Sequence, residues 1–177
     1  FDVGGVIFLP KNKNKRESKN LLSSYKELCL LLREIKIPKE EFYEKTKEIY
    51  FKSTKGEISK KQVLRSLSKI LHLSSKKVES LFAKTIKENI VENKPLINLI
   101  LKLKKKGYKT GILSIQWHLS KNVLVPKRYN KIFDAMVISC NNKIRKPESK
   151  SYKLLLKKLG VRPEETLFVD DKQEILD

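Results

Sequence analysis

The sequence is poor in cysteine and has no long apolar run. Cys29 and Cys140 are the two cysteines among 177 residues, which is too few for a disulfide framework, and they lack the spacing of zinc ligands. No stretch approaches the ~18 consecutive apolar residues of a transmembrane helix. A disulfide-rich secreted scaffold, a zinc finger and a membrane-spanning protein are therefore not expected, and the expected compartment is a reducing one, the cytoplasm.

Methionine is nearly absent as well. The single methionine is Met136, and the chain opens on Phe1-Asp2 in what reads as the middle of a strand. The sequence also stops at Asp177, a few residues after another apolar run. We expect a fragment that is incomplete at both ends.

Arginine is scarce although the chain is strongly basic. The formal net charge is +20 and the isoelectric point about 9.9, yet only 6 of the 40 basic residues are arginine. A basic surface attracts polyanions, but the two dense runs, 11–16 and 102–106, contain no aromatic residues for base stacking. Base readout also relies mainly on arginine, so we expect a solvated basic surface rather than a nucleic-acid site.

Four short apolar runs predict a parallel sheet. They lack the alternation of half-exposed strands, which is typical of strands covered on both faces. Helical patterns lie between the later runs, at 119–125 and at 151–159, the latter closed by Gly160. The alternation predicts an α/β fold, a doubly wound, Rossmann-like parallel sheet. The predicted strands are Phe1 with Val3–Phe8, Thr110–Leu113, Ala135–Ile138 and Leu167–Val169.

The hundred residues between the first two predicted strands have helical periodicity instead. Pro38 and Pro95 stand where helices begin, and Ser59 with Gln62 forms a predicted capping box. The first four helices form an inserted all-helical cap over 16–92, and the core comprises 1–15 and 93–177. The predicted helices are 18–35, 39–53, 60–71, 75–91 and 94–106.

Polar residues follow the predicted strands at one edge of the sheet. Asp2 opens the first strand, Ser114 ends the second, Lys146 follows the third, and Asp170 with Asp171 ends the fourth. Ligands of open parallel sheets bind beyond the carboxyl ends of the strands. Acids beside a lysine suit Mg²⁺ next to a phosphoryl group, because carboxylates bind the metal and cationic donors bind phosphate oxygens.

These residues also form an ordered set of motifs. The order resembles the haloacid dehalogenase superfamily, and the helical insert is similar to its C1-capped branch. Each motif alone is weak, but four in order on the expected elements make a specific signal that covers essentially the whole chain. The motifs are FDVGGVI at 1–7, ILS at 112–114, KPE at 146–148 and LFVDD at 167–171.

The resemblance implies a role for each matching position. Asp2 would be the nucleophile that forms an aspartyl-phosphate. Ser114 and Lys146 would bind phosphoryl oxygens, assisted by the backbone N–H groups of Gly5 and Ile115.

The resemblance also implies Mg²⁺ as the cofactor. Asp2 and Asp171 would bind the ion directly, Asp170 through water, and Gly4 through its backbone carbonyl. Glu174 would help to orient this metal site.

Gly4 departs from the pattern of most phosphatases in the superfamily, which carry a second Asp there as general acid and base. Such catalysis contributes roughly 10²–10⁴ in rate. Either another group substitutes, with His118 beside Trp117 weighed against a plain packing role, or the leaving group needs no proton. A sugar 1-phosphate or an acyl phosphate would satisfy the second case.

The leading prediction is a Mg²⁺-dependent phosphatase for a small phosphorylated metabolite such as a sugar phosphate. The turn 54–57 of the cap is a candidate for reaching the pocket. One alternative is a non-catalytic protein of the same fold that binds an anionic partner, even RNA. The other is a 2-haloacid dehalogenase, which the acidic pair Asp170-Asp171 disfavours. Neither a membrane nor, despite the charge, a nucleic acid is the expected partner.

Overall fold

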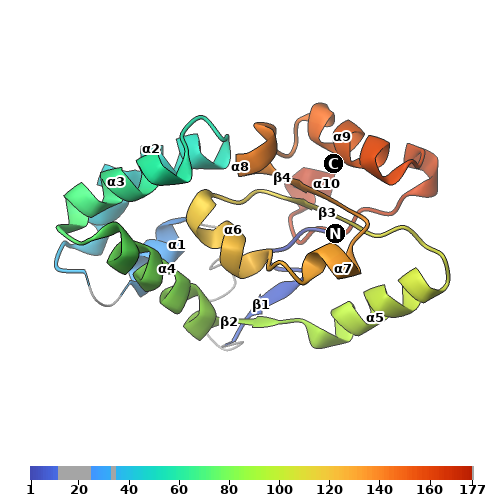
Figure 1. Cartoon of the computed structure of the whole chain (residues 1–177), viewed down its shortest axis with the longest axis horizontal. Helices are drawn as coiled ribbons and strands as arrows, with labels where there is room; N and C mark the ends of the chain where they lie inside the picture. Colours follow the sequence, from blue (N-terminus) through green and yellow to red (C-terminus); the bar gives the residue numbers. More distant parts are fainter. Residues whose placement is uncertain (12–24, 33–34, 177) are drawn as a thin grey trace.

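The protein has an α/β fold with a Rossmann-like core and a group of helices at one end (Figure 1). The computed structural model describes residues 1–11, 25–32 and 35–176. Within them, β3 (Gly111–Ser114) and β4 (Ala135–Ile138) pair in parallel and in register along their whole length. The second and third predicted strands are thereby confirmed, with the former shifted by one residue.

The first predicted strand is wrong in its extent. Phe1 lies beside β3, where its carbonyl accepts from Leu113 N at 3.1 Å. The chain then turns, because Gly5 adopts φ +80° and its N–H donates to Phe8 O at 2.9 Å. A short strand, β1 (Phe8–Pro10), begins only there and pairs antiparallel with β2 (Ile90–Glu92).

The fourth predicted strand, Leu167–Val169, does not form a regular strand. It contacts the core through a hydrogen bond from Asp2 N to Val169 O of 2.9 Å, and Phe168 packs against the apolar cluster around β3 and β4. Leu167 is 85% exposed, so this apolar residue lies outside the core. The segment still brings the residues after Val169 next to the residues after Phe1.

Four helices lie at one end of the molecule, on the left in Figure 1. The capping box of Ser59 and Gln62 is confirmed, with each side chain bonded to the other residue's backbone. Pro38 is the residue before α2 rather than its first residue. The helices are α1 (Tyr25–Leu31), α2 (Lys39–Thr54), α3 (Lys60–Leu71) and α4 (Ser75–Asn89).

The predicted bounds of the cap and core stay a prediction. The boundary at 15/16 and the start of the helix expected over 18–35 lie outside the described residues, as does most of the basic run 11–16. At the other boundary, the helical part ends with α4, and β2 pairs with β1.

The remaining helices flank the parallel strands (Figure 1). Helix α9 packs Leu155 against Leu113 and Val137, and it ends at Gly160 in the left-handed conformation, as predicted. These helices are α5 (Lys94–Lys105), α6 (His118–Leu124), α7 (Tyr129–Ile132), α8 (Ser139–Asn142), α9 (Ser149–Leu159) and α10 (Gln173–Leu176), with a 3-10 turn at Pro163–Glu165.

Trp117 joins the helical end to the sheet. Its buried indole contacts Tyr25 and Tyr50 of the cap helices edge-on, at ring-centroid distances of 5.3 and 5.5 Å. Phe82 of α4 packs against it at 5.0 Å. One apolar cluster therefore spans both parts of the molecule. Among the described helices, none is both long and apolar enough to cross a membrane.

Candidate active site

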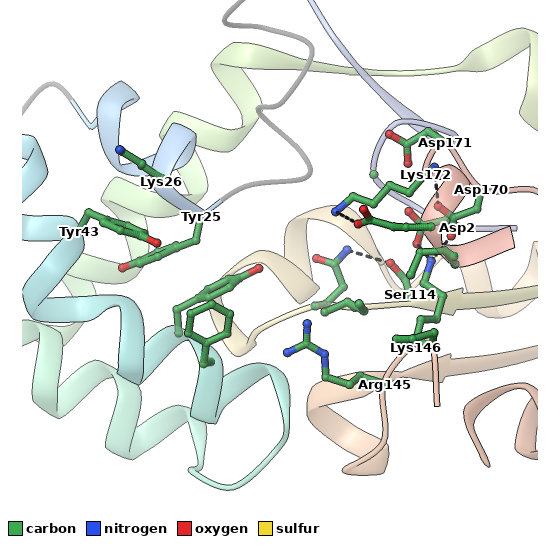
Figure 2. Close-up of a pocket in the computed structure, with 18 residues that line it drawn as sticks. Asp2, Tyr25, Lys26, Tyr43, Ser114, Arg145, Lys146, Asp170, Asp171 and Lys172 are labelled. Atoms are coloured by element: carbon green, nitrogen blue, oxygen red, sulfur yellow. Dashed lines mark hydrogen bonds and ion pairs between the residues drawn. The ribbon is translucent and has the colours of Figure 1, made fainter. Parts of the chain in front are cut away.

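A cavity of about 490 Å³ lies between the edge of the sheet and the first two helices (Figure 2). The core contributes polar side chains to its wall, and the cap helices contribute mostly aromatic ones. The core residues are Asp2, Ser114, Lys146, Asp170 and Asp171, and the cap residues are Tyr25, Lys26, Tyr43, Tyr50 and Phe51.

Three carboxylates meet at the core end of this cavity. Asp2, Asp170 and Asp171 each place an oxygen atom within 4.8 Å of the other two. Lys146 Nζ forms an ion pair of 2.8 Å with Asp2 Oδ1 and a second ion pair with Asp170 Oδ2. The other oxygen of Asp170 accepts from Lys172 N at 3.0 Å. The structure thus brings together four of the predicted residues, although they lie up to 169 positions apart in the sequence.

The charges in this cluster do not balance. The side chains of Lys146 and Asp170 are 3% and 1% exposed. Among the described residues, Lys146 is the cation that forms ion pairs with this group of three carboxyls. Burial, together with the negative charges of Asp2 and Asp170, raises the pKa of Asp171 above its usual value. The oxygen set and its surplus negative charge fit a divalent cation such as Mg²⁺.

Gly5 makes room for this cluster. A Cβ atom at this position would lie 2.3 Å from Asp171 Cγ, closer than any side chain could tolerate. The N–H of Gly5, which the resemblance assigned to a phosphate, is bonded to Phe8 O instead. Gly4, by contrast, lines the cavity.

Ser114 is held in place by a hydrogen-bond chain. Its buried Oγ accepts from Gln116 Nε2 at 3.1 Å, and Gln116 Oε1 accepts from Ser120 Oγ at 2.7 Å. Because Ser114 accepts from Gln116, its own proton can be donated to a ligand. Sequence reasoning did not find Gln116, although a polar residue two positions after Ser114 was an available signal. Ile115 lines the cavity as well.

His118 lies away from the cavity, so the structure does not support it as a substitute general base. Its ring Nε2 lies 3.0 Å from Ile58 O, and its backbone N–H donates to Ser53 Oγ at 3.1 Å. Burial lowers the pKa of His118. The packing role that was weighed against catalysis describes this position better.

Two further predicted positions have a clear location. Glu174 lines the cavity and its carboxylate lies 3.9 Å from Lys172 Nζ. The turn 54–57 faces helix α8, where a Cβ on Gly56 would lie 2.8 Å from Cys140 O. The cap wall of the cavity is therefore formed by α1 and α2 rather than by that turn.

Three acids around one lysine, at the edge of a Rossmann-like sheet and beside a group of helices, place the chain among α/β proteins with a polar site that fits a divalent cation. A profile of the haloacid dehalogenase-like hydrolase family matches residues 1–174, and the chain belongs to this family. The predicted superfamily is thereby confirmed.

Curated relatives share segments of this chain. Acyl-CoA dehydrogenase family member 10 of Mus musculus is 30% identical over 66% of the chain and 11% of its own length. Bifunctional epoxide hydrolase 2 of Rattus norvegicus is 25% identical over 97% of the chain and 32% of its own length. Glyceraldehyde 3-phosphate phosphatase of Pyrococcus furiosus is 33% identical over 41% of the chain and 31% of its own length. The chain thus spans a third or less of these relatives.

Solved structures share the fold. A HAD-like family hydrolase from Porphyromonas gingivalis superposes with a TM-score of 0.74 at 18% identity, covering 99% of this chain and 82% of its own. A HAD family enzyme from Bacteroides thetaiotaomicron, solved as a magnesium complex, has a TM-score of 0.71 at 21% identity, covering 98% of this chain and 82% of its own. The same enzyme was also solved with magnesium and inorganic phosphate. The predicted fold class is confirmed.

Proposed function

We propose that the protein is a Mg²⁺-dependent phosphatase that acts on a small phosphorylated metabolite through an aspartyl-phosphate on Asp2. The observation that carries this proposal is the cluster of Asp2, Asp170 and Asp171 around Lys146, facing one cavity. Magnesium complexes of one enzyme with this fold, and a phosphatase among the partial relatives, support it.

Asp2 and Lys146 would carry out the phosphoryl transfer. Lys146 holds one oxygen of Asp2 at 2.8 Å, which fixes the direction of the carboxylate. The carboxylate attacks phosphorus in line, the bond from phosphorus to the leaving oxygen breaks, and water later cleaves the aspartyl-phosphate. Ser114 Oγ and Lys146 Nζ donate hydrogen bonds to the phosphoryl oxygens.

Asp2, Asp170, Asp171 and the carbonyl of Gly4 are the groups that would hold Mg²⁺, in the roles proposed from the resemblance. A bound Mg²⁺ supplies positive charge to the phosphoryl oxygens as they approach Asp2. This charge offsets the repulsion between a carboxylate nucleophile and an anionic substrate.

Gly4 provides no acid to protonate the leaving group, and His118 lies elsewhere. The substrate is therefore proposed to have a leaving group of low basicity, as in a sugar 1-phosphate or an acyl phosphate. A dehalogenase is a weaker candidate, because halide displacement at carbon needs no cation beside Asp2, and the acidic pair Asp170 and Asp171 would then have no role.

The test is hydrolysis of p-nitrophenyl phosphate with Mg²⁺ or with EDTA. We expect Mg²⁺-dependent release, a loss of at least about 10³-fold in Asp2→Asn, and no change in Glu164→Gln, which alters an exposed acid outside the cavity. Calorimetry measures Mg²⁺ binding separately. A folded protein that binds Mg²⁺ but releases no nitrophenol contradicts the proposal and supports the non-catalytic alternative.

A further inference from the structure

The cavity has a second cationic group at the end opposite the acid cluster. Figure 2 shows the guanidinium of Arg145 directed into the cavity, toward the cap side, whereas Lys146 points toward Asp2 and Asp170. Two neighbouring residues of one loop thus place positive charges at opposite ends of the same space. Two ion pairs account for the position of the Lys146 ammonium. No ion pair among the described residues accounts for the position of the Arg145 guanidinium.

Few of the hydrogen-bond donors of the Arg145 guanidinium have a partner in the protein. Within the residues that the structure describes, its guanidinium makes one hydrogen bond, from Nη1 to Thr54 Oγ1 at a long 3.4 Å, and no ion pair. Guanidinium has five N–H donors in a planar fork. The remaining donors of this partly buried group are available to a ligand in the cavity.

The other cations of the cavity wall differ in this respect. Lys26 is an exposed residue with its Nζ 5.9 Å from the centroid of the Tyr43 ring, and Lys172 lies 3.9 Å from a carboxylate of Glu174. Arg145 therefore stands out as the partly buried cation of this wall without an acidic partner among the described residues.

The size and wall of the cavity indicate what such a ligand would be. Sites for small molecules typically measure about 300–1,000 Å³, and the 490 Å³ here leaves room well beyond a phosphoryl group. The aromatic side chains of Tyr50 and Phe51 line the cavity, with their rings in contact. Burial raises the pKa of Tyr50 to about 12, while the positive charge of Arg145 acts in the opposite direction, so the guanidinium is within electrostatic reach of that ring.

We propose that Arg145 binds a second anionic group of the substrate, so that the protein prefers phosphomonoesters with a carboxylate or a further phosphate at the end remote from the scissile phosphate. This inference rests on the proposed function. A planar guanidinium suits either anion, because both accept two parallel N–H bonds. Arg145 is then a specificity-determining residue, and Lys146 beside it serves the reacting phosphate.

The test compares substrates that differ at one end. Glucuronic acid 1-phosphate and glucose 1,6-bisphosphate carry a second anion remote from the 1-phosphate, and glucose 1-phosphate does not. All three have the anomeric leaving group of low basicity that the proposed function requires. We expect kcat/KM to be higher for at least one anionic ester, and the better of the two identifies the anion. In Arg145→Gln the ratio of kcat/KM between that ester and glucose 1-phosphate should fall by about 10- to 100-fold, and Arg145→Lys should lose part of it. Arg162→Gln, a matched loss of an exposed guanidinium paired with Glu165, should keep the ratio.

Binding separates this proposal from the proposed function. Calorimetry with Asp2→Asn and Mg²⁺ measures the affinity for the same three compounds without turnover, and adding Arg145→Gln should remove the preference for the second anion. If none of the compounds is hydrolysed but binding still prefers the second anion in a way that depends on Arg145, the proposed phosphatase activity is overturned and the proposed anion site is supported. Equal affinity for all three compounds, or equal losses for all three in Arg145→Gln, overturns the anion site and leaves Arg145 as a link to Thr54.

Discussion

Gly5 lies in the backbone turn that follows Phe1 and also lies directly against the acid cluster. Its φ of +80° and the 2.3 Å that would separate a Cβ from Asp171 Cγ impose two separate requirements. The first is conformational and the second is steric. Gly107 has the first requirement alone, with φ +89° and nothing within 4 Å of a Cβ.

This pair of glycines gives a prediction with a built-in control. Gly5→Ala and Gly107→Ala should both lower the free energy of unfolding by about 1 kcal/mol, because alanine disfavours positive φ. Gly5→Ala alone should also weaken Mg²⁺ binding by 10-fold or more, because the methyl group displaces the Asp171 carboxylate. Urea unfolding and calorimetry measure the two effects. Unchanged Mg²⁺ affinity in Gly5→Ala would contradict a metal site that includes Asp171.

The sequence predicted the members of the candidate site better than their surroundings. Lys146, Asp170 and Asp171 were expected together because residues that follow parallel strands share one edge of the sheet, and the first motif added Asp2. The cluster forms although the runs at 1–8 and 167–169 are not the predicted strands. Arg145 was not found, because its direction depends on how the loop after α8 meets the cap, and that contact is not encoded in any local pattern.

Among the helices, α3 has the most complete N-terminal cap. Ser59 accepts from Gln62 N, and Gln62 in turn accepts from Ser59 N at 2.8 Å. The helix buries Val63 and Leu67 in the main apolar cluster, so a frayed start would loosen packing as well as hydrogen bonding.

We therefore expect Ser59→Ala to lower the free energy of unfolding by about 1 kcal/mol. Ser66→Ala, inside the same helix, should be neutral or slightly stabilising, because alanine has the higher helix propensity. Urea denaturation of both variants measures the difference. Equal stabilities for the two would show that the cap does not limit the stability of α3.

Most of the longer helices were predictable, whereas two strands and the short helices α7, α8 and α10 were not, for a physical reason. The start and the end of a helix are set by local signals. The capping box of Ser59 predicts where α3 begins, the left-handed Gly160 predicts where α9 ends, and both predictions agree with the structure. The runs at 1–8 and 167–169 are apolar enough for strands, but the turn at Gly5 and the exposure of Leu167 interrupt them. Residues 1–8 are mostly buried without forming one continuous strand, and residues 167–169 are neither fully buried nor part of a strand, so an apolar run alone does not predict a strand.

At the scale of the whole molecule, a few polar contacts fasten the cap to the core. His118 at the start of α6 bonds to Ile58 O and, through its backbone, to Ser53 Oγ. Arg145 reaches Thr54 at the end of α2. These contacts lie at one junction, between the turn after α2 and the loops beyond β3 and β4, and the cavity opens beside them.

The His118 contact makes this junction sensitive to pH. Burial lowers the pKa of His118 in the folded protein, with the positive charges of Lys121 and Lys60 acting in the same direction and the bond to Ile58 O opposing them. The unfolded chain therefore binds a proton first as the pH falls below the ordinary histidine pKa of about 6.5. Under linkage, the stability that neutral His118 contributes is present above that pH and declines below it, down to the lower folded-state pKa.

Acidification from pH 7.5 to 5.5 should thus lower the free energy of unfolding more in the wild type than in His118→Gln. Both proteins retain His72 and every carboxylate, so the difference between their pH profiles isolates His118. Urea unfolding in EDTA, at half-unit steps of pH, measures it without interference from metal binding. Parallel profiles would place the protonation of His118 outside the folding equilibrium, and the junction between cap and core would then depend on the Arg145–Thr54 contact and on the packing around Trp117.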